Sequence, residues 1–473
     1  MFIHSVQKFL TFYQKLGKKD ASAYRQFVKN MPGSGPAALE LLDVLKKEPR
    51  DSEFKIGEIC SKLYENDTKG GRIKVQNALS DLNLQMPKFL LYRKATDQSP
   101  ESRWLWLAVL RDLDIRDEFS EAFGQWRQEV KAGSRENDLD YWKNAAVDQL
   151  ALSYLGPSET GEYADLLRDF NQDLDLYYAL AKLKTACLRV NARNLQGVNN
   201  ELEHLAPPVG LINHPGLDAH PPILLYREVY RLLITPGEEQ YSHIIALLNL
   251  HADAVDVKDL HLIVRYLDNY ANRRIINGEE EYWKRVNDLN KFSHNRQIFL
   301  REGPFPTSNF INIVAAACNA GDLKWAHTFI AFYSATLPEA DRDDVLLLSN
   351  ATIAFEQKDF QRVLDHLELK DFEQLFANIR SRSLILRSLY ECEENDGRVE
   401  DYCASFERYL RKHREEVAAQ PVDTMINSVR IVRKLLEQKL TRDQLKTAIE
   451  ETKPLYFKTW LLEKAARYPD HRM

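Results

Sequence analysis

The chain has 473 residues, 44% hydrophobic and 28% charged, which are the proportions of a globular protein with a core and not of a disordered chain. No window approaches ~18 uninterrupted apolar residues, so we predict no membrane span. Lysines interrupt the apolar residues of the first twenty positions, which argues against a secretory signal. The five cysteines are scattered and form no CxxC pair, so we expect reduced, buried thiols and a cytoplasmic protein.

Charge is distributed unevenly along the chain. The net charge is −6, yet residues 1–100 contain 17 Lys and Arg against 11 Asp and Glu. A basic front joined to an acidic body is consistent with an anionic partner at the front. Basic residues dispersed over solvated helix faces would give the same count, so composition leaves both interpretations open.

Residues 1–96 are predicted to form a small basic helical module. Apolar residues recur at helical spacing over 6–16, 38–47, 54–64 and 72–94. Pro87 is expected to kink or end the last of these helices. The stretch DQSPES at 97–102 has the composition of a linker.

The helical period continues beyond this linker through three further regions, 103–204, 223–300 and 306–473. A break with five prolines and two glycines, residues 205–222, separates the first two of them. Period-two alternation never extends beyond a few residues, so strands are not expected. We predict an all-α fold made of antiparallel helix pairs, because one pair cannot bury both of its faces and long all-α chains stack such pairs.

One helix pair in the last region, FINIVAAACNAGDLKWAHTFIAFYSATLP at residues 310–338, has Gly321 at a turn, Ala326 five residues later and Pro338 at its end. With these residues the pair resembles a tetratricopeptide repeat, which implies that Ala326 stands where the two helices cross. The resemblance is weaker over VLLLSNATIAFEQKDFQRVLDHL, where Lys358 follows Gly321 by 37 positions, and it fades by about residue 410. It implies a degenerate TPR-like α-solenoid that follows the small N-terminal module.

The resemblance also implies a binding groove, because the first helix of each repeat lines the concave face. The family's groove positions fall on Ser308, Ile311, Ala315 and Asn319 in one pair, and on Leu348, Thr352, Phe355 and Glu356 in the next. The lysine and asparagine set with which some family members clamp a terminal carboxylate is absent, so we expect an apolar peptide or helix instead. Packing against neighbouring helices is an equally good interpretation of these eight residues.

A second resemblance is more general. The segments NALSDLNLQMPKFLL and PLYFKTWLLEKA are similar to an uncharacterised group of long helical proteins from the Bacteroidetes lineage. This resemblance implies no activity or ligand.

Residue types that form known catalytic and metal sites do not cluster in the sequence. His204, His214 and His220 lie in the proline-rich break without the i, i+4 spacing of a helical metal site, and there is no G-x-S-x-G elbow. We therefore predict a non-enzymatic protein without catalytic residues, cofactor or metal. Two carboxylates that meet only in the folded chain would leave no sequence motif.

The sequence thus predicts a scaffold or adaptor that binds another protein, whose identity it does not specify. The alternative is a nucleic-acid-binding regulator with a helix-turn-helix-like front module, in which the solenoid acts as a sensor or dimerisation arm. Its candidate contacts are Lys69, Arg72 and Lys74 at the start of a helix. However, the predicted turn before this helix is about seven residues long, where a helix-turn-helix has three or four.

Overall fold

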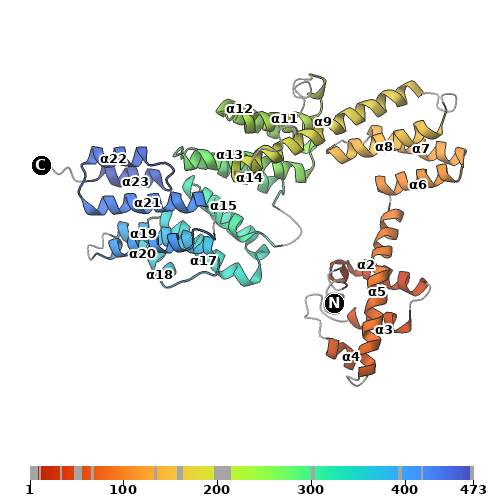
Figure 1. The fold of residues 1–473 in the computed structure, drawn as a ribbon, viewed down its shortest axis with the longest axis horizontal. Helices are drawn as coiled ribbons and strands as arrows, with labels where there is room; N and C mark the ends of the chain where they lie inside the picture. The colour runs from red at the N-terminus through yellow and green to blue at the C-terminus, as the bar shows by residue number, and fades with distance from the viewer. Residues whose placement is uncertain are drawn as a thin grey trace. The chain divides into compact units, whose positions relative to one another are not determined.

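The computed structural model describes residues 9, 12–31, 35–46, 56–64, 69–97, 99–132, 136–156, 163–196, 215–299, 304–392, 397–416 and 419–468 (Figure 1). Every regular element in these ranges is a helix, and they contain no strand. The prediction of an all-α protein is confirmed.

The chain divides into two compact units. Unit 1 comprises residues 1–134 and 139–175, and unit 2 comprises residues 135–138 and 176–473. The division falls inside the longest described helix, α9 (Tyr163–Gln196), so the two units share a continuous helix.

The first part of unit 1 packs four helices around one core. These helices are α2 (Lys18–Asn30), α3 (Pro36–Leu45), α4 (Ile56–Tyr64) and α5 (Lys69–Thr96). The buried Tyr24 hydroxyl donates a hydrogen bond to the carbonyl of Leu82 at 2.7 Å, which ties α2 to α5. Helix α5 continues through Pro87 to Thr96, so the proline does not end it.

The second part of unit 1 has a core of its own. It consists of α6 (Pro100–Asp112), α7 (Arg116–Ala132), α8 (Asp138–Tyr154) and the first turns of α9. Ser99 caps α6 by accepting a hydrogen bond from the amide of Ser102, and Pro100 occupies the first helical position, where the missing amide costs nothing. The predicted 97–102 linker is therefore largely the start of a helix.

Unit 2 contains a series of helices in which each one packs against the next. In chain order they are α11 (Pro221–Ile234), α12 (Glu238–His251), α13 (Val257–Ile276), α14 (Tyr282–Asn295), α15 (Thr307–Asn319), α16 (Leu323–Tyr333), α17 (Glu339–Glu356), α18 (Phe360–Leu367), α19 (Leu375–Glu391), α20 (Arg398–Lys412), α21 (Ala419–Glu437), α22 (Arg442–Glu451) and α23 (Lys458–Ala466). Short 3-10 turns lie at Pro215–Leu217, Ala252–Ala254 and Ser334–Thr336. Alternate helices also pack together, namely α11 with α13, α15 with α17, and α17 with α19.

The helices from α15 onward share one continuous apolar core, which extends from Phe305 to Tyr468. Ala326 has no exposed surface and belongs to this core together with Phe310 and Phe329, whose ring centres are 4.9 Å apart. A small residue at this position is what close approach of two helices requires.

The turns after α15 and α17 have the same backbone geometry. Gly321 and Lys358 both have left-handed φ values, +74° and +63°. In each turn the amide of the following aspartate donates to a carbonyl five residues earlier, at 2.9 Å. Asp322 and Asp359 then cap α16 and α18 by accepting hydrogen bonds from backbone amides. The pairs α15–α16 and α17–α18 are therefore joined by turns of the same geometry.

Two further expectations concern the membrane and the cysteines. No described helix is long and apolar enough to cross a membrane. All five cysteines are free thiols, and four of them are buried, the exception being the partly buried Cys392. Burial raises the pKa of the Cys318 thiol to about 12, so this thiol stays protonated near neutral pH.

Candidate partner-binding cavity

A cavity of about 180 Å³ lies inside unit 2, and we call it the unit 2 cavity. Its walls come from residues that are far apart in the sequence: Ile275, Glu280, Trp283, Ala315, Asn319, Thr352, Glu356, Phe376, Ile379, Arg380, Ser383, Leu384, Arg387, Val422, Met425, Leu455, Tyr456 and Phe457. The lining is mostly apolar and aromatic with a few charged groups, which is the usual character of a ligand-binding site.

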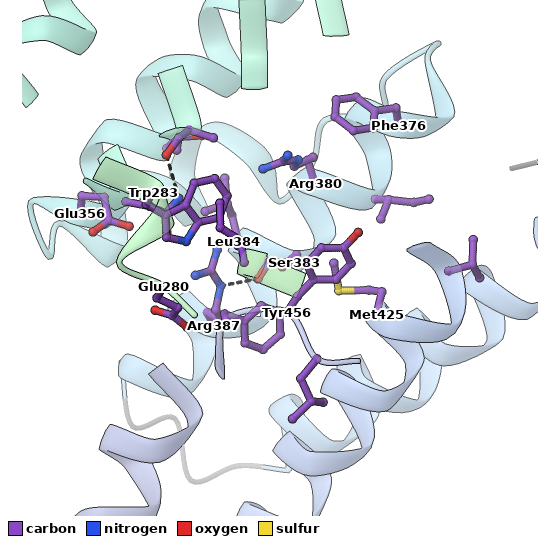
Figure 2. Close-up of a pocket in the computed structure, with 18 residues that line it drawn as sticks. Glu280, Trp283, Glu356, Phe376, Arg380, Ser383, Leu384, Arg387, Met425 and Tyr456 are labelled. Atoms are coloured by element: carbon purple, nitrogen blue, oxygen red, sulfur yellow. Dashed lines mark hydrogen bonds between the residues drawn. The ribbon is translucent and has the colours of Figure 1, made fainter. Parts of the chain in front are cut away.

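Four helices each contribute one face to the cavity. Spacings of three, four or seven residues keep side chains on one side of a helix, and the lining residues of α15, α17, α19 and α21 follow these spacings. Helix α19 contributes most, from Phe376 at one end of the cavity to Arg387 at the other (Figure 2).

The cavity is completed by contact between two segments about 180 residues apart. The amide of Thr459, at the start of α23, donates to Glu280 Oε1 at 2.6 Å, near the start of α14. Gly278 lies so close to Lys458 that a Cβ there would stand 2.8 Å from its side chain. The turn between α13 and α14 is therefore held against the start of α23, and Trp283 and Tyr456 reach the same cavity.

Arg387 lies between aromatic rings at one end of the cavity. Its guanidinium is 4.3 Å from the centre of the Phe355 ring and 4.9 Å from that of Phe457. Burial lowers its pKa to about 10, and the nearby Glu356 and Glu280 partly oppose this effect. Burial raises the pKa of Glu356, although part of this side chain remains in contact with solvent, and Arg387 opposes the rise. Two carboxyls thus accompany the Arg387 cation.

Arg380 stands at the other end, near Phe376, Met425 and Tyr456 (Figure 2). Its guanidinium donates to Asn312 Oδ1 at 2.7 Å and lies 5.3 Å from the Phe376 ring centre. Burial lowers the pKa of Arg380, opposed by Tyr456. Among the described residues no carboxylate forms an ion pair with it, so this end of the cavity carries a positive charge without a counterion.

The structure brings half of the predicted groove residues together. Ala315, Asn319, Thr352 and Glu356 all line the unit 2 cavity. The other four, which do not line it, are the exposed Ser308 and the buried Ile311, Leu348 and Phe355. The last three belong to the shared core of unit 2, where they pack against neighbouring helices, and the Phe355 ring also contacts Arg387.

The candidate nucleic-acid contacts lie at the start of α5 in unit 1. Arg72 and Lys74 are exposed, and the Lys74 ammonium is 5.4 Å from the centre of the Tyr64 ring. The side chain of Lys69 lies outside the described residues. In the same helix Val75, Leu79 and Leu82 are almost fully buried.

Sequence reasoning did not identify Arg380 and Arg387 as part of a site. A signal was present, because the two arginines are seven residues apart on a face of α19 whose other residues are apolar except for Ser383. Trp283 and Tyr456 have no comparable signal, since they reach the cavity through contacts between distant segments.

No family model, curated protein or solved structure matches the chain. The described residues also contain no group of three or more His, Cys, Asp or Glu that could hold a metal ion. The cavity and its charges are therefore the features that bear on function.

Proposed function

We propose that the chain is a non-enzymatic scaffold that binds a segment of another protein in the unit 2 cavity. The helix pairs of unit 2 would form a degenerate TPR-like α-solenoid, with α15, α17 and α19 as the first helices of successive pairs. The observation that carries the proposal is that these three helices pack side by side and all line the same cavity. First helices that line a shared concave surface are the recognition device of helical-repeat proteins.

The repeated turn supports this proposal. Gly321 and Lys358 occupy equivalent left-handed positions 37 residues apart, and each is followed by an aspartate that caps the second helix. A period near 34 residues is typical of tetratricopeptide repeats. The second pair departs from the repeat pattern at Val363, which is larger than Ala326 at the equivalent position of the first pair.

The carboxyls of Glu280 and Glu356 are the feature most suited to an enzyme, because paired carboxyls serve as acid and base in hydrolases. Both interact electrostatically with Arg387, which neutralises part of their charge. We assign them to holding this cation and not to acid–base work. Among the residues that the structure describes, the cavity lining has no histidine or cysteine that could act as a base or nucleophile.

Site-specific photo-crosslinking in the native host tests the proposal. A photoreactive residue at Asn319, at the edge of the cavity, is expected to capture a discrete protein. The same residue at Asn309 is the matched control, since Asn309 is an exposed asparagine of α15 that does not line the cavity. Thr352→Trp, which would fill the cavity, is expected to abolish the adduct.

Equal adducts from positions 319 and 309, or an adduct that survives Thr352→Trp, would contradict binding in the cavity. Native mass spectrometry of the purified chain supplies an independent check. A bound small molecule that is released by Glu356→Gln would favour an enzyme over a scaffold.

A further inference from the structure

We infer that the Arg380 end of the unit 2 cavity recognises an acidic side chain, aspartate or glutamate, that is flanked by apolar side chains in an internal segment of the partner protein. This inference rests on the proposed function and names the chemistry of its ligand. It departs from the expectation of a purely apolar ligand, because the arginines of α19 were not among the predicted groove residues.

The two arginines differ in the charges around them. Arg387 interacts with Glu356 and Glu280. Arg380 lies beside the neutral Asn312 and the rings of Phe376 and Tyr456, and the like charges of Arg380 and Arg387 repel each other. A neutral amide oxygen occupies one of the five guanidinium donors but does not balance the charge. A partly buried cation without a counterion is costly, so an incoming carboxylate gains both Coulomb energy and charge-assisted hydrogen bonds.

The cavity around Arg380 is largely apolar. Phe376 and Ile379 precede Arg380 on α19, and Val422 and Met425 of α21 line the same cavity. Val422 and Met425 are nearly fully buried. A charged group can be held there only if apolar side chains of the partner cover the rest of the lining, and the low polarity then strengthens the ion pair.

The cavity is also too small to enclose a long stretch of a partner chain. The cavity of about 180 Å³ is smaller than the roughly 300–1,000 Å³ of sites that enclose drug-sized ligands. It accepts one or two side chains and leaves the partner's backbone outside. We therefore assign the carboxylate to an aspartate or glutamate side chain and not to the end of a chain.

Selection from a random peptide library tests the inference. The purified full-length chain is exposed to acetylated, amidated nonapeptides, with a second library that has a free C-terminus. The wild-type chain is expected to enrich Asp or Glu next to Leu, Phe or Trp from the blocked library. Arg380→Met is expected to lose the acidic preference and keep the apolar one. Arg362→Met is the matched control, because Arg362 is exposed on α18 and does not line the cavity.

The best selected peptide then allows a double-mutant cycle. Hydrogen bonds to charged groups contribute about 1.5–3 kcal/mol, so Arg380→Met should weaken its binding roughly 10- to 100-fold. Replacing Asp by Asn, or Glu by Gln, in the peptide should weaken its binding to the wild-type chain by a similar factor. The changed peptide should then bind the Arg380→Met chain no more weakly than it binds the wild-type chain. Thermal melts of each variant establish that the fold is retained.

The outcomes separate the inference from the function on which it rests. Peptides that are enriched without an acidic residue, or an acidic preference that survives Arg380→Met, would refute the inference and leave the scaffold intact. If peptides are enriched only from the library with a free C-terminus, the claim that the ligand is an internal segment is refuted. If Thr352→Trp and the wild-type chain enrich the same peptides, or neither enriches any, the proposed function itself fails.

Discussion

At the scale of single residues, a group of largely buried charges in unit 2 surrounds Lys184. Its ammonium pairs with Asp138 and, at 2.7 Å, with Asp259, which also accepts a hydrogen bond from the Tyr226 hydroxyl at 2.8 Å. Burial raises the pKa of Asp259, and Lys184 is the strongest influence that opposes the rise. The ammonium therefore favours the ionised form of a buried carboxyl.

We predict that Lys184→Met destabilises the protein by about 3 kcal/mol near pH 7, since it leaves a buried carboxylate without its partner. Without Lys184 the pKa of Asp259 rises further in the folded state. A carboxyl whose folded pKa exceeds its unfolded value near 4 destabilises the fold above the folded pKa, and this cost disappears as the pH falls toward 4. Urea unfolding at pH 7.5 and pH 4.5 should thus show that Lys184→Met lowers the free energy of unfolding less at the lower pH.

The control for this prediction is Asp259→Asn in the Lys184→Met background. It removes the buried charge and is expected to recover part of the lost stability at pH 7.5. A loss that is the same at both pH values would show that Lys184 contributes through packing alone.

At the scale of elements, the repeated turn explains how α15 and α16, and then α17 and α18, form pairs. A left-handed residue ends the first helix, and an aspartate caps the second. Left-handed φ costs a residue with a Cβ about 1–2 kcal/mol, and glycine avoids this cost. Position 321 therefore carries the favourable residue, glycine, and position 358 carries a less favourable one, lysine.

We predict that Gly321→Ala lowers the free energy of unfolding by about 1 kcal/mol and that Lys358→Gly raises it by about 1 kcal/mol. No atom lies within 4 Å of a Cβ built at Gly321, so the effect is one of backbone conformation. Gly237→Ala is the control, because Gly237 has an extended φ of −154° and equally open surroundings. Denaturant melts in which Gly321→Ala and Gly237→Ala lose the same stability would refute this account.

The sequence predicted helices better than it predicted the cavity, and the reason is physical. Helical period and capping residues are local, so Gly321 and Asp322 mark a turn in the sequence itself. The predicted groove residues of α15 and α17 that line the unit 2 cavity, such as Asn319 and Thr352, came from a repeat pattern that is also local. The contact of Gly278 with Lys458 joins segments 180 positions apart, and no local pattern encodes it.

At the scale of the whole molecule, the uneven charge of the chain bears on the choice between a protein-binding scaffold and a nucleic-acid-binding regulator. Residues 1–100 have six more basic than acidic residues, but several of these cations are paired within unit 1. Arg25 pairs with Asp43, Arg93 with Asp20, and Lys94 with Asp97 and Glu101. Helix α5 also directs a row of apolar residues into the core of the module. These contacts favour a structural role for the paired cations and for α5, while the excess of six basic residues itself is unchanged by such pairs.

We therefore predict that the full-length chain binds duplex DNA more weakly than about 10 µM at 150 mM salt, and that replacing Arg72 and Lys74 with alanine leaves this binding unchanged. Fluorescence anisotropy over a salt series measures both the affinity and its salt dependence. If the two side chains contacted phosphates, each loss would reduce the slope of log K against log salt by roughly one unit. Lys88→Ala serves as a control, because Lys88 is exposed near the far end of α5.

Micromolar or tighter binding that disappears in the double variant and survives Lys88→Ala would make the regulator the better description, with unit 2 as its sensor or dimerisation arm. The unit 2 cavity would then hold a ligand that controls DNA binding, and the acidic peptides selected through Arg380 should change the DNA affinity, whereas a scaffold without DNA binding has no such coupling to show.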